Sequence, residues 1–152
     1  MRDRSTNASG PPAGARAEGA APPPASLGRS TRQRRLIVAL LERARRPLSP
    51  AELVAAAREQ LPTIGVSTIY RTIRALEEAG EIVAVEIPGR ASRYEPSAAA
   101  SRHHHHFHCR SCDRLYDVRG CPGDMEELLP HGFALEEHTI LLSGRCEACN
   151  QP

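Results

Sequence analysis

The chain has 152 residues, enough for one domain of ordinary size or two small ones, and aromatic residues make up only 3% of it. Its net charge of +2 is unevenly distributed along the chain. Residues 27–80 are basic, with ten Arg and five Glu, whereas residues 103–152 are acidic, with four Arg and eight Asp or Glu. We therefore expect only the first part to meet a polyanion. Four of the five cysteines form two Cys-x-x-Cys pairs, unlike a secreted disulfide framework, and no apolar run is long enough to cross a membrane. These features predict a cytoplasmic protein.

Residues 1–29 are predicted to form a disordered tail. They are mostly Ala, Pro, Gly, Ser and Arg, and such a segment buries too little apolar surface to offset the entropy lost on ordering. A transit peptide is the alternative, although its prolines would interrupt an amphipathic helix. From Ser30 to Pro47 the apolar residues recur at helical spacing, which predicts a first helix that Pro47 ends. The residues of this stripe are Leu36, Ile37, Leu40, Leu41 and Ala44.

A second helix is predicted to follow directly. Ser49 and Glu52 have the spacing of a capping box, and Pro50 between them suits the first position of a helix. The apolar pattern continues to about Gln60, where Leu61 and a proline stop it.

A third helix is expected to have Ser67 as its N-cap and to end at Gly80, a residue type that favours the left-handed conformation. The segments 82–87 and 92–95 flank a Pro-Gly turn and are typical of a β-hairpin. Three helices followed by a two-stranded wing predict a winged helix-turn-helix over residues 30–95, whose third helix would enter the DNA major groove. The inner stripe of this helix is predicted to be Ile69, Ile73 and Leu76.

Residues 96–102 are predicted to be a short hinge, and residues 103–152 a small α/β domain. The expected elements are strands over residues 107–109 and 115–118, a short acidic helix over 124–129 and a longer strand over 133–143. The fold class is therefore α+β, with a winged-helix domain followed by a small metal-binding domain.

Two Cys-x-x-Cys pairs in this second domain predict a structural zinc site. Four thiolates supply the closed tetrahedral ligand set that structural zinc uses. The 33 residues between the pairs include a predicted helix and strands, so the metal would join the first strand to the end of the chain. A redox dithiol is the competing interpretation, and two pairs in one small unit argue against it. The predicted ligands are Cys109, Cys112, Cys146 and Cys149.

A run of four histidines, residues 103–106, precedes the first Cys pair. On an extended segment the first and third histidines face one way and the second and fourth face the other. One tetrapeptide could therefore supply two metal sites on opposite sides, with a solvated polar loop as the alternative. Cys121 and His138 are candidates to complete one site, although a lone Cys is more often a small buried apolar residue.

These motifs resemble the ferric uptake regulator (Fur) family of metal-sensing repressors over residues 31–149. The all-histidine run is most similar to the zinc uptake regulator (Zur) branch of that family. The resemblance rests on Thr31-Arg32-Gln33-Arg34, Ser67-Thr68-Ile69-Tyr70-Arg71-Thr72, His103 to His106 before Cys109-x-x-Cys112, His131-Gly132-Phe133, and His138 ahead of Gly144-x-Cys146-x-x-Cys149.

The resemblance implies a DNA-binding winged helix, a dimerisation domain, a four-cysteine structural zinc site and a sensory metal site at the hinge. Carried over by position, the regulatory site of the dimerisation domain would use His103, His105 and His138. Its fourth ligand is normally a Glu in the family. Here Cys121 is the nearest match, with Asp124 as the rival.

The hinge site that the resemblance implies is distinct from this regulatory site of the dimerisation domain. The residues that match its ligands are Glu95, His104 and His106. The family often brings a His to this site from just before the second helix, where this chain has Pro47, and the Asp commonly found between the histidines is His105. The hinge site is therefore short of a ligand, for which Glu81 and Glu86 are candidates.

We predict a homodimeric, metal-responsive DNA-binding repressor that senses zinc rather than iron, because imidazole and thiolate ligands make a softer site than carboxylates. Its expected partner is double-stranded, palindromic operator DNA. The predicted DNA contacts are Tyr70, Arg71 and Arg74, with backbone contacts from Arg32, Arg34 and Arg90. The alternatives are an iron- or peroxide-sensing repressor of the same family, a zinc-dependent enzyme with Glu95 or Asp124 as its base, and a thiol redox protein. An enzyme is not expected, since the chain offers no lid and little pocket-forming apolar surface.

Overall fold

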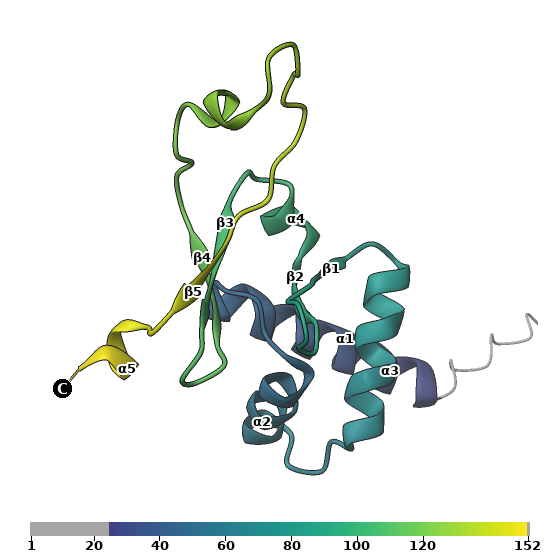
Figure 1. The fold of residues 1–152 in the computed structure, drawn as a ribbon. Coiled ribbons are helices and arrows are strands. Elements are labelled where there is room, and N and C mark those ends of the chain that lie inside the picture. Colours follow the sequence, from purple (N-terminus) through teal and green to yellow (C-terminus); the bar gives the residue numbers. More distant parts are fainter. Residues whose placement is uncertain (1–24, 152) are drawn as a thin grey trace, which may run out of the picture.

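The computed structural model describes residues 25–151 as an α+β protein with two connected halves (Figure 1). The first half comprises three helices and a two-stranded sheet, and the second is built around a three-stranded sheet. Of the tail predicted over residues 1–29, residues 1–24 lie outside the described part. None of the helices in the described residues is both long and apolar enough to span a membrane.

Helix α1 (Ala25–Ala44) begins before Ser30, where the sequence pattern starts it. Once the packed part of a helix has formed, each added residue gains a hydrogen bond at little further cost, so the helix extends by about one turn. At the other end Arg45 adopts a left-handed backbone with φ 51°. Pro47 follows and has no N–H to continue the helix, so the helix ends before it as predicted.

Helix α2 (Pro50–Gln60) has the bounds that the capping box predicted. The Glu52 N–H donates to Ser49 Oγ at 3.2 Å, and the Ser49 N–H donates to the Glu52 carboxylate at 2.9 Å. Both donors would otherwise be unpaired at the start of the helix, which is why this pair fixes the boundary.

Helix α3 (Val66–Glu78) begins earlier than predicted, since its N-cap is Gly65 and Ser67 already lies inside the helix. The Gly65 carbonyl accepts hydrogen bonds from the next residues of the first turn, including the Ile69 N–H at 3.2 Å. The turn therefore closes on the backbone without a side-chain cap. At the C-terminal end Gly80 has φ 67°, the left-handed conformation that was predicted.

The core of the first half lies where the three helices meet. The predicted stripes of α1 and α3 point into it, and burial of each large aliphatic side chain contributes about 1.5–3 kcal/mol. Large, fully buried members of this core include Ile37, Leu41, Leu53, Ile69 and Leu76. This burial fixes the rotation of α3 and turns the opposite face of that helix to solvent.

The first half ends in the predicted antiparallel hairpin, whose strands are β1 (Ile82–Val85) and β2 (Arg93–Pro96). The hinge predicted over residues 96–102 begins instead with one helical turn, α4 (Ser97–Ala100). Ser97 Oγ donates a hydrogen bond to the carbonyl oxygen of Gly80 at 2.6 Å. The link between the halves is therefore anchored to the end of α3.

The second half is organised around one central strand. Its elements are β3 (His105–Cys109), β4 (Leu115–Val118), the 3-10 turn η1 (Met125–Leu128), β5 (Leu141–Gly144) and α5 (Glu147–Asn150). Strand β3 pairs antiparallel with β4 and parallel with β5. A Cβ on Gly144 would lie 3.2 Å from the Phe107 ring, so glycine lets β5 approach β3 closely.

Two predictions for this half are corrected. The strand predicted over residues 133–143 is regular only from Leu141, because β3 begins at His105 and offers the preceding residues no strand to pair with. The acidic helix predicted over residues 124–129 is a single 3-10 turn that follows Asp124.

An ion-pair cluster joins β2 to the turn between β3 and β4. Arg93, only 2% exposed, donates from Nη2 to Asp113 Oδ2 and to the Asp113 carbonyl oxygen, each at 2.7 Å. His108 Nε2 lies 2.8 Å from Asp113 Oδ1, and Arg90 Nη1 lies 3.5 Å from the same atom. The His108 hydrogen bond and the charge of Arg93 hold the pKa of Asp113 below its usual value. One carboxylate therefore couples the two halves.

Replacing Asp113 by Asn should lower the free energy of unfolding by about 2 kcal/mol, because it leaves the buried Arg93 charge uncompensated. This value is at the low end of the usual cost of breaking a buried ion pair, because the Asp113 side chain is itself 47% exposed. Asn tolerates the left-handed backbone at this position, where φ is 57°. Urea denaturation of the metal-loaded chain measures the effect.

The matched control is Glu126→Gln, which removes a carboxylate from an exposed position on η1. Its effect should stay within about 0.5 kcal/mol. Equal stability of the Asp113→Asn and Glu126→Gln chains would show that the ion-pair cluster does not hold the halves together.

Candidate metal centres and nucleic-acid interface

Three groups of candidate ligands surround β3. Within each group, one ligand atom per residue lies within 4.8 Å of the others. The cysteine cluster is Cys109, Cys112, Cys146 and Cys149; the His–Cys cluster is His103, His105, Cys121 and His138; the hinge cluster is Glu95, His104, His106 and Asp117. Successive side chains of an extended segment point to opposite faces, which accounts for the division of the four histidines.

Pairing of β3 with β5 builds the cysteine cluster. Cys109 is fully buried at the end of β3 and lies opposite Gly144 in the parallel register. Cys146, two residues after Gly144, therefore lies close to Cys109. The Cys146 N–H donates to Cys109 Sγ at 3.3 Å, and the Sγ atoms of Cys112 and Cys146 are 3.8 Å apart. Zn–S bonds of about 2.3 Å in a tetrahedron imply sulfur separations of roughly 3.8 Å. The donor set therefore fits zinc.

The environment of these thiols favours a cation. Hydrogen bonds from the backbone N–H groups of Cys112 and Cys146 lower the pKa of Cys109 to about 6. Hydrogen bonds with the Cys146 and Cys112 side chains raise the pKa of Cys149 to about 12, because closely spaced thiols resist carrying several negative charges. A bound dication would neutralise that charge, so metal binding here should release protons.

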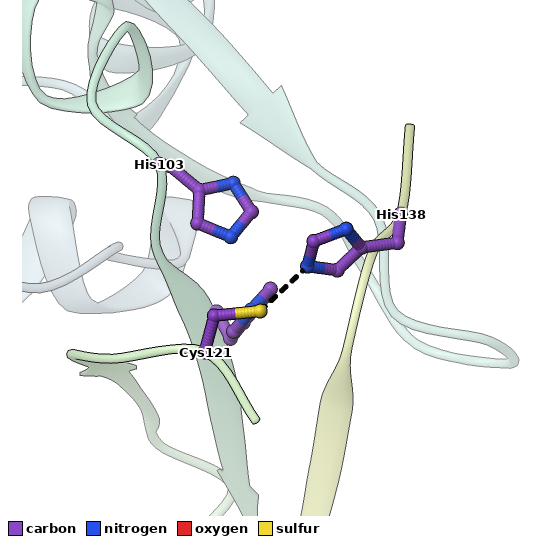
Figure 2. Close-up of side chains that lie close together, drawn as sticks. His103, Cys121 and His138 are labelled. Atoms are coloured by element: carbon purple, nitrogen blue, oxygen red, sulfur yellow. Dashed lines mark hydrogen bonds between the residues drawn. The ribbon is translucent and has the colours of Figure 1, made fainter. Parts of the chain in front are cut away.

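In the His–Cys cluster three segments converge. Figure 2 shows His103 ahead of β3, Cys121 after β4 and His138 ahead of β5 pointing toward one another. Cys121 Sγ lies 3.0 Å from His138 Nε2, and the ring centroids of His103 and His138 are 4.7 Å apart. Among the described residues the fourth member beside His105 is therefore Cys121, and Asp124 belongs to no candidate cluster.

His105 is the buried member of this cluster, with 2% of its surface exposed. Neither of its ring nitrogens has a hydrogen-bond partner within the described part of the chain. Burial, together with the charges of His103 and His138, lowers the pKa of His105, so the ring is neutral near pH 7 and able to bind a metal. Unsatisfied buried polar atoms cost about 1–3 kcal/mol each, and a metal ion would satisfy one of them.

The hinge cluster joins the two halves. Glu95 of β2 is 3% exposed, and its Oε2 lies 3.2 Å from His104 Nε2 and 3.9 Å from His106 Nε2. Asp117 Oδ1 lies 4.0 Å from His106 Nε2, which is buried without a hydrogen-bond partner among the described residues. Burial and the neighbouring Glu95 raise the pKa of Asp117. Two close carboxylates facing two imidazoles form a donor set that a divalent cation would stabilise.

Asp117 is the hinge residue that the sequence prediction missed. The candidates Glu81 and Glu86 lie elsewhere, since Glu81 pairs with Arg34 and Glu86 accepts a hydrogen bond within the hairpin. The available signal was strand pairing, because the antiparallel register of β3 and β4 sets His106 opposite Asp117. Both strands were predicted, but their pairing and register were not.

The exposed face of α3 carries the predicted DNA contacts. Tyr70 is 54% exposed, Arg71 is exposed, and Arg74 pairs at 2.8 Å with Glu78, one turn along the helix. Arg71 and Arg32 of α1 line the same surface hollow. Cationic side chains from two helices therefore meet on this face.

The other two predicted backbone contacts are engaged within the chain. Arg34 pairs with Glu81, and Arg90 pairs with Asp113. A DNA phosphate would have to compete with these carboxylates. Arg32 and Arg71 are therefore better disposed to meet a polyanion than Arg34 and Arg90.

A profile of the ferric uptake regulator family matches residues 26–143. The chain belongs to this family. The zinc uptake regulation protein of Mycobacterium tuberculosis is 34% identical over 128 residues, which cover 80% of this chain and 94% of that protein. The ferric uptake regulation protein of Bacillus subtilis is 30% identical over 115 residues, with coverages of 73% and 77%. Members are dimeric, metal-responsive transcription regulators, so the chain is a regulator and not an enzyme.

Solved structures share the α+β fold. A zinc-bound manganese uptake regulator is 29% identical with a TM-score of 0.65, over 75% of this chain and 87% of that one. The ferric uptake regulator of Francisella tularensis, solved with iron, is 25% identical with a TM-score of 0.60, over 78% and 92%. Because these relatives are named for different metals, family membership alone does not set the metal that this chain senses.

Replacing His105 by Leu should stabilise the chain by about 1 kcal/mol when only the cysteine cluster is loaded, because it removes two unsatisfied buried nitrogens. The same change should reduce the further stabilisation that added zinc gives the wild type, leaving the share that comes from the hinge cluster. Urea unfolding with and without added zinc measures both effects.

Acid dependence gives a second check on His105. Its lowered pKa means that the unfolded chain takes up a proton that the folded ring resists, so wild-type stability should fall as the pH drops below about 6.5. The His105→Leu chain should lack this component. Replacement of the exposed His131 by Leu should change neither measurement. Undiminished zinc stabilisation in the His105→Leu chain would exclude His105 as a ligand.

Proposed function

We propose that the chain is a homodimeric, zinc-responsive repressor that acts in the cytoplasm on palindromic operator DNA. The observation that carries this proposal is the His–Cys cluster, in which three imidazoles and one thiol converge around a buried, unpartnered His105. On this proposal residues 30–95 form the winged-helix DNA-binding domain, residues 96–102 the hinge, and residues 103–152 the metal-binding dimerisation domain.

The cysteine cluster is proposed to hold a structural zinc ion. Its four thiols supply a closed set with no open position, and the separation of 3.8 Å between Cys112 and Cys146 suits tetrahedral Zn–S bonds. When bound, zinc supplies the charge that stabilises adjacent thiolates and links β3 to the end of the chain.

Zinc is favoured over iron at the His–Cys cluster because of ligand softness. Imidazole and thiolate donors suit Zn(II), whereas carboxylates suit harder cations. The hinge cluster, with two carboxylates and two imidazoles, is harder and carries less of this preference. The zinc uptake regulation protein among the relatives supports the same metal.

Metal responsiveness is proposed to depend on both regulatory clusters: zinc in the His–Cys cluster would fix residues 103–106, the segment that also supplies His104 and His106, and the hinge cluster would join the two halves. Glu95 belongs to the first half, while His104, His106 and Asp117 belong to the second. These ligands come together only when the halves are close, so a metal that binds them favours the closed arrangement. In that arrangement the two α3 helices of a dimer would fit consecutive half-sites of an operator.

Dimer formation through the second half is supported by apolar side chains that remain open to solvent there. Leu128 is 80% exposed, Phe133 is 69% exposed and Leu142 on β5 is 47% exposed. Large exposed side chains gathered on one domain are typical of a protein interface. Strand β5 is also an edge of its sheet, which leaves backbone groups available to a partner.

Zinc titration of the protein with labelled operator DNA tests the proposal, with the operator obtained by selection from random DNA. Replacing Cys121 by Ser should raise the zinc concentration needed for half-maximal DNA binding by roughly 10-fold or more, because a hydroxyl is a poor zinc ligand. Fluorescence anisotropy, with the cysteine cluster kept loaded, measures this response.

The comparison variant is Cys121→Glu, which supplies a hard ligand at the same position and should move the preference from Zn(II) toward Fe(II). Wild-type DNA affinity that is indifferent to zinc would contradict the proposal. A response to Fe(II) but not zinc would favour the iron-sensing alternative, and loss of folding in Cys121→Ser would assign Cys121 to the core.

Replacing Arg71 by Ala should weaken operator binding roughly 10-fold and relax selectivity at the contacted base, since base contacts by Arg contribute about 1–3 kcal/mol. The matched control is Arg58→Ala on the exposed surface of α2, outside every cluster described above. Equal losses in both variants would indicate a general charge effect and not recognition by α3.

A further inference from the structure

A hollow of about 300 Å³ lies where α1, β2, α4 and the end of β4 meet, between the two halves. Its basic lining residues are Arg45, Arg46, Arg102 and Arg119. A neighbouring hollow shares Arg102, Arg119 and Asp117 with it and reaches His103 and His104. The two together are called the arginine hollow below. It is separate from the surface of α3 and belongs to none of the DNA contacts described above.

Among the described residues, three of these four arginines have no hydrogen-bond or ion-pair partner, although the charge of Arg119 acts on Asp117 and partly offsets the rise in its pKa that burial causes. Arg46 is held by Glu52 at 2.7 Å. Arg45, Arg102 and Arg119 make no side-chain hydrogen bond or ion pair with any residue in the described range. Unpaired guanidinium groups gathered around one hollow repel one another, and an anion between them would relieve that repulsion.

Two of the carboxylates that line the hollow, those of Glu95 and Asp117, face imidazoles of the hinge cluster. Glu95 faces the imidazole of His104 at 3.2 Å, and Asp117 faces that of His106 at 4.0 Å. Both are members of the hinge cluster, so a metal bound there would take them as ligands. Only Glu42 would then remain to balance the arginines. Occupation of the hinge cluster therefore raises the positive potential of the hollow.

We propose that the arginine hollow binds a small dianion with carboxylate or phosphate groups, and binds it more tightly when a metal ion occupies the hinge cluster. The coupling with metal rests on the proposed function. The guanidinium fork matches the paired oxygens of both groups, and the volume is that of a site for a small molecule. By linkage the dianion must tighten metal binding by the same factor. The chain would thus respond to a metal and an anion together.

Zinc titration of the full chain at fixed ionic strength tests this coupling. Cys121→Ser with His138→Ala disables the His–Cys cluster, so that the titration reports the hinge cluster while the cysteine cluster stays loaded. Succinate is added in one arm and glycerol 3-phosphate in the other, with sodium chloride as the reference. The apparent zinc affinity should rise about 5-fold or more in at least one arm. The arm with the larger effect distinguishes dicarboxylates from phosphate monoesters.

In the same background Arg102→Ala with Arg119→Ala should abolish the rise, and Arg58→Ala should retain it. An unchanged zinc affinity in both arms, or an equal rise in the Arg102→Ala/Arg119→Ala chain, would overturn the proposal. So would loss of operator affinity by this double variant with no dianion present, because those arginines would then serve DNA phosphates. Absence of zinc binding in the reference titration would instead count against the hinge metal of the proposed function.

Discussion

The register of β3 is the constraint on which the three ligand clusters depend. A slip of one residue would move every side chain of the strand to the other face, exchange the histidines between clusters and carry Cys109 away from its partners. Pairing on both sides prevents this, since β4 sets His106 opposite Asp117 and β5 sets Cys109 opposite Gly144. Gly144 is itself part of the restraint, because a Cβ there would crowd the Phe107 ring at 3.2 Å.

The same strand reaches the first half through the turn that follows it. Asp113, next to Cys112, has a left-handed backbone and directs its carboxylate to the buried Arg93 of β2. A metal held by the cysteine cluster would fix this turn. The cysteine cluster would therefore stabilise more than the second half, because the position of the hairpin depends on the turn between β3 and β4.

Local signals in the sequence accounted for the features that form from neighbouring residues. The capping box of Ser49 and Glu52 defined α2, and alternation along residues 103–106 predicted that the histidines divide between two groups of side chains. The missed features depend on distant partners. Residues 133–140 have strand-like composition but no strand beside them, and Asp117 became a candidate ligand only through its register with β3. Metal-ligand spacing is visible in a sequence, whereas cross-strand register is not.

The two regulatory clusters differ in whether a bound metal can bring the two halves of the chain together. All members of the His–Cys cluster belong to the second half, so filling it cannot by itself draw the halves together. The hinge cluster includes Glu95 of β2, whose carboxylate is almost completely buried and held by His104. Any free energy that a regulatory metal contributes to closure must therefore pass through Glu95, since a ligand shifts a conformational equilibrium only by its differential affinity for the two states. A metal ion in the His–Cys cluster would satisfy one of the two unpaired nitrogens of His105, and a metal ion in the hinge cluster would satisfy Nε2 of His106.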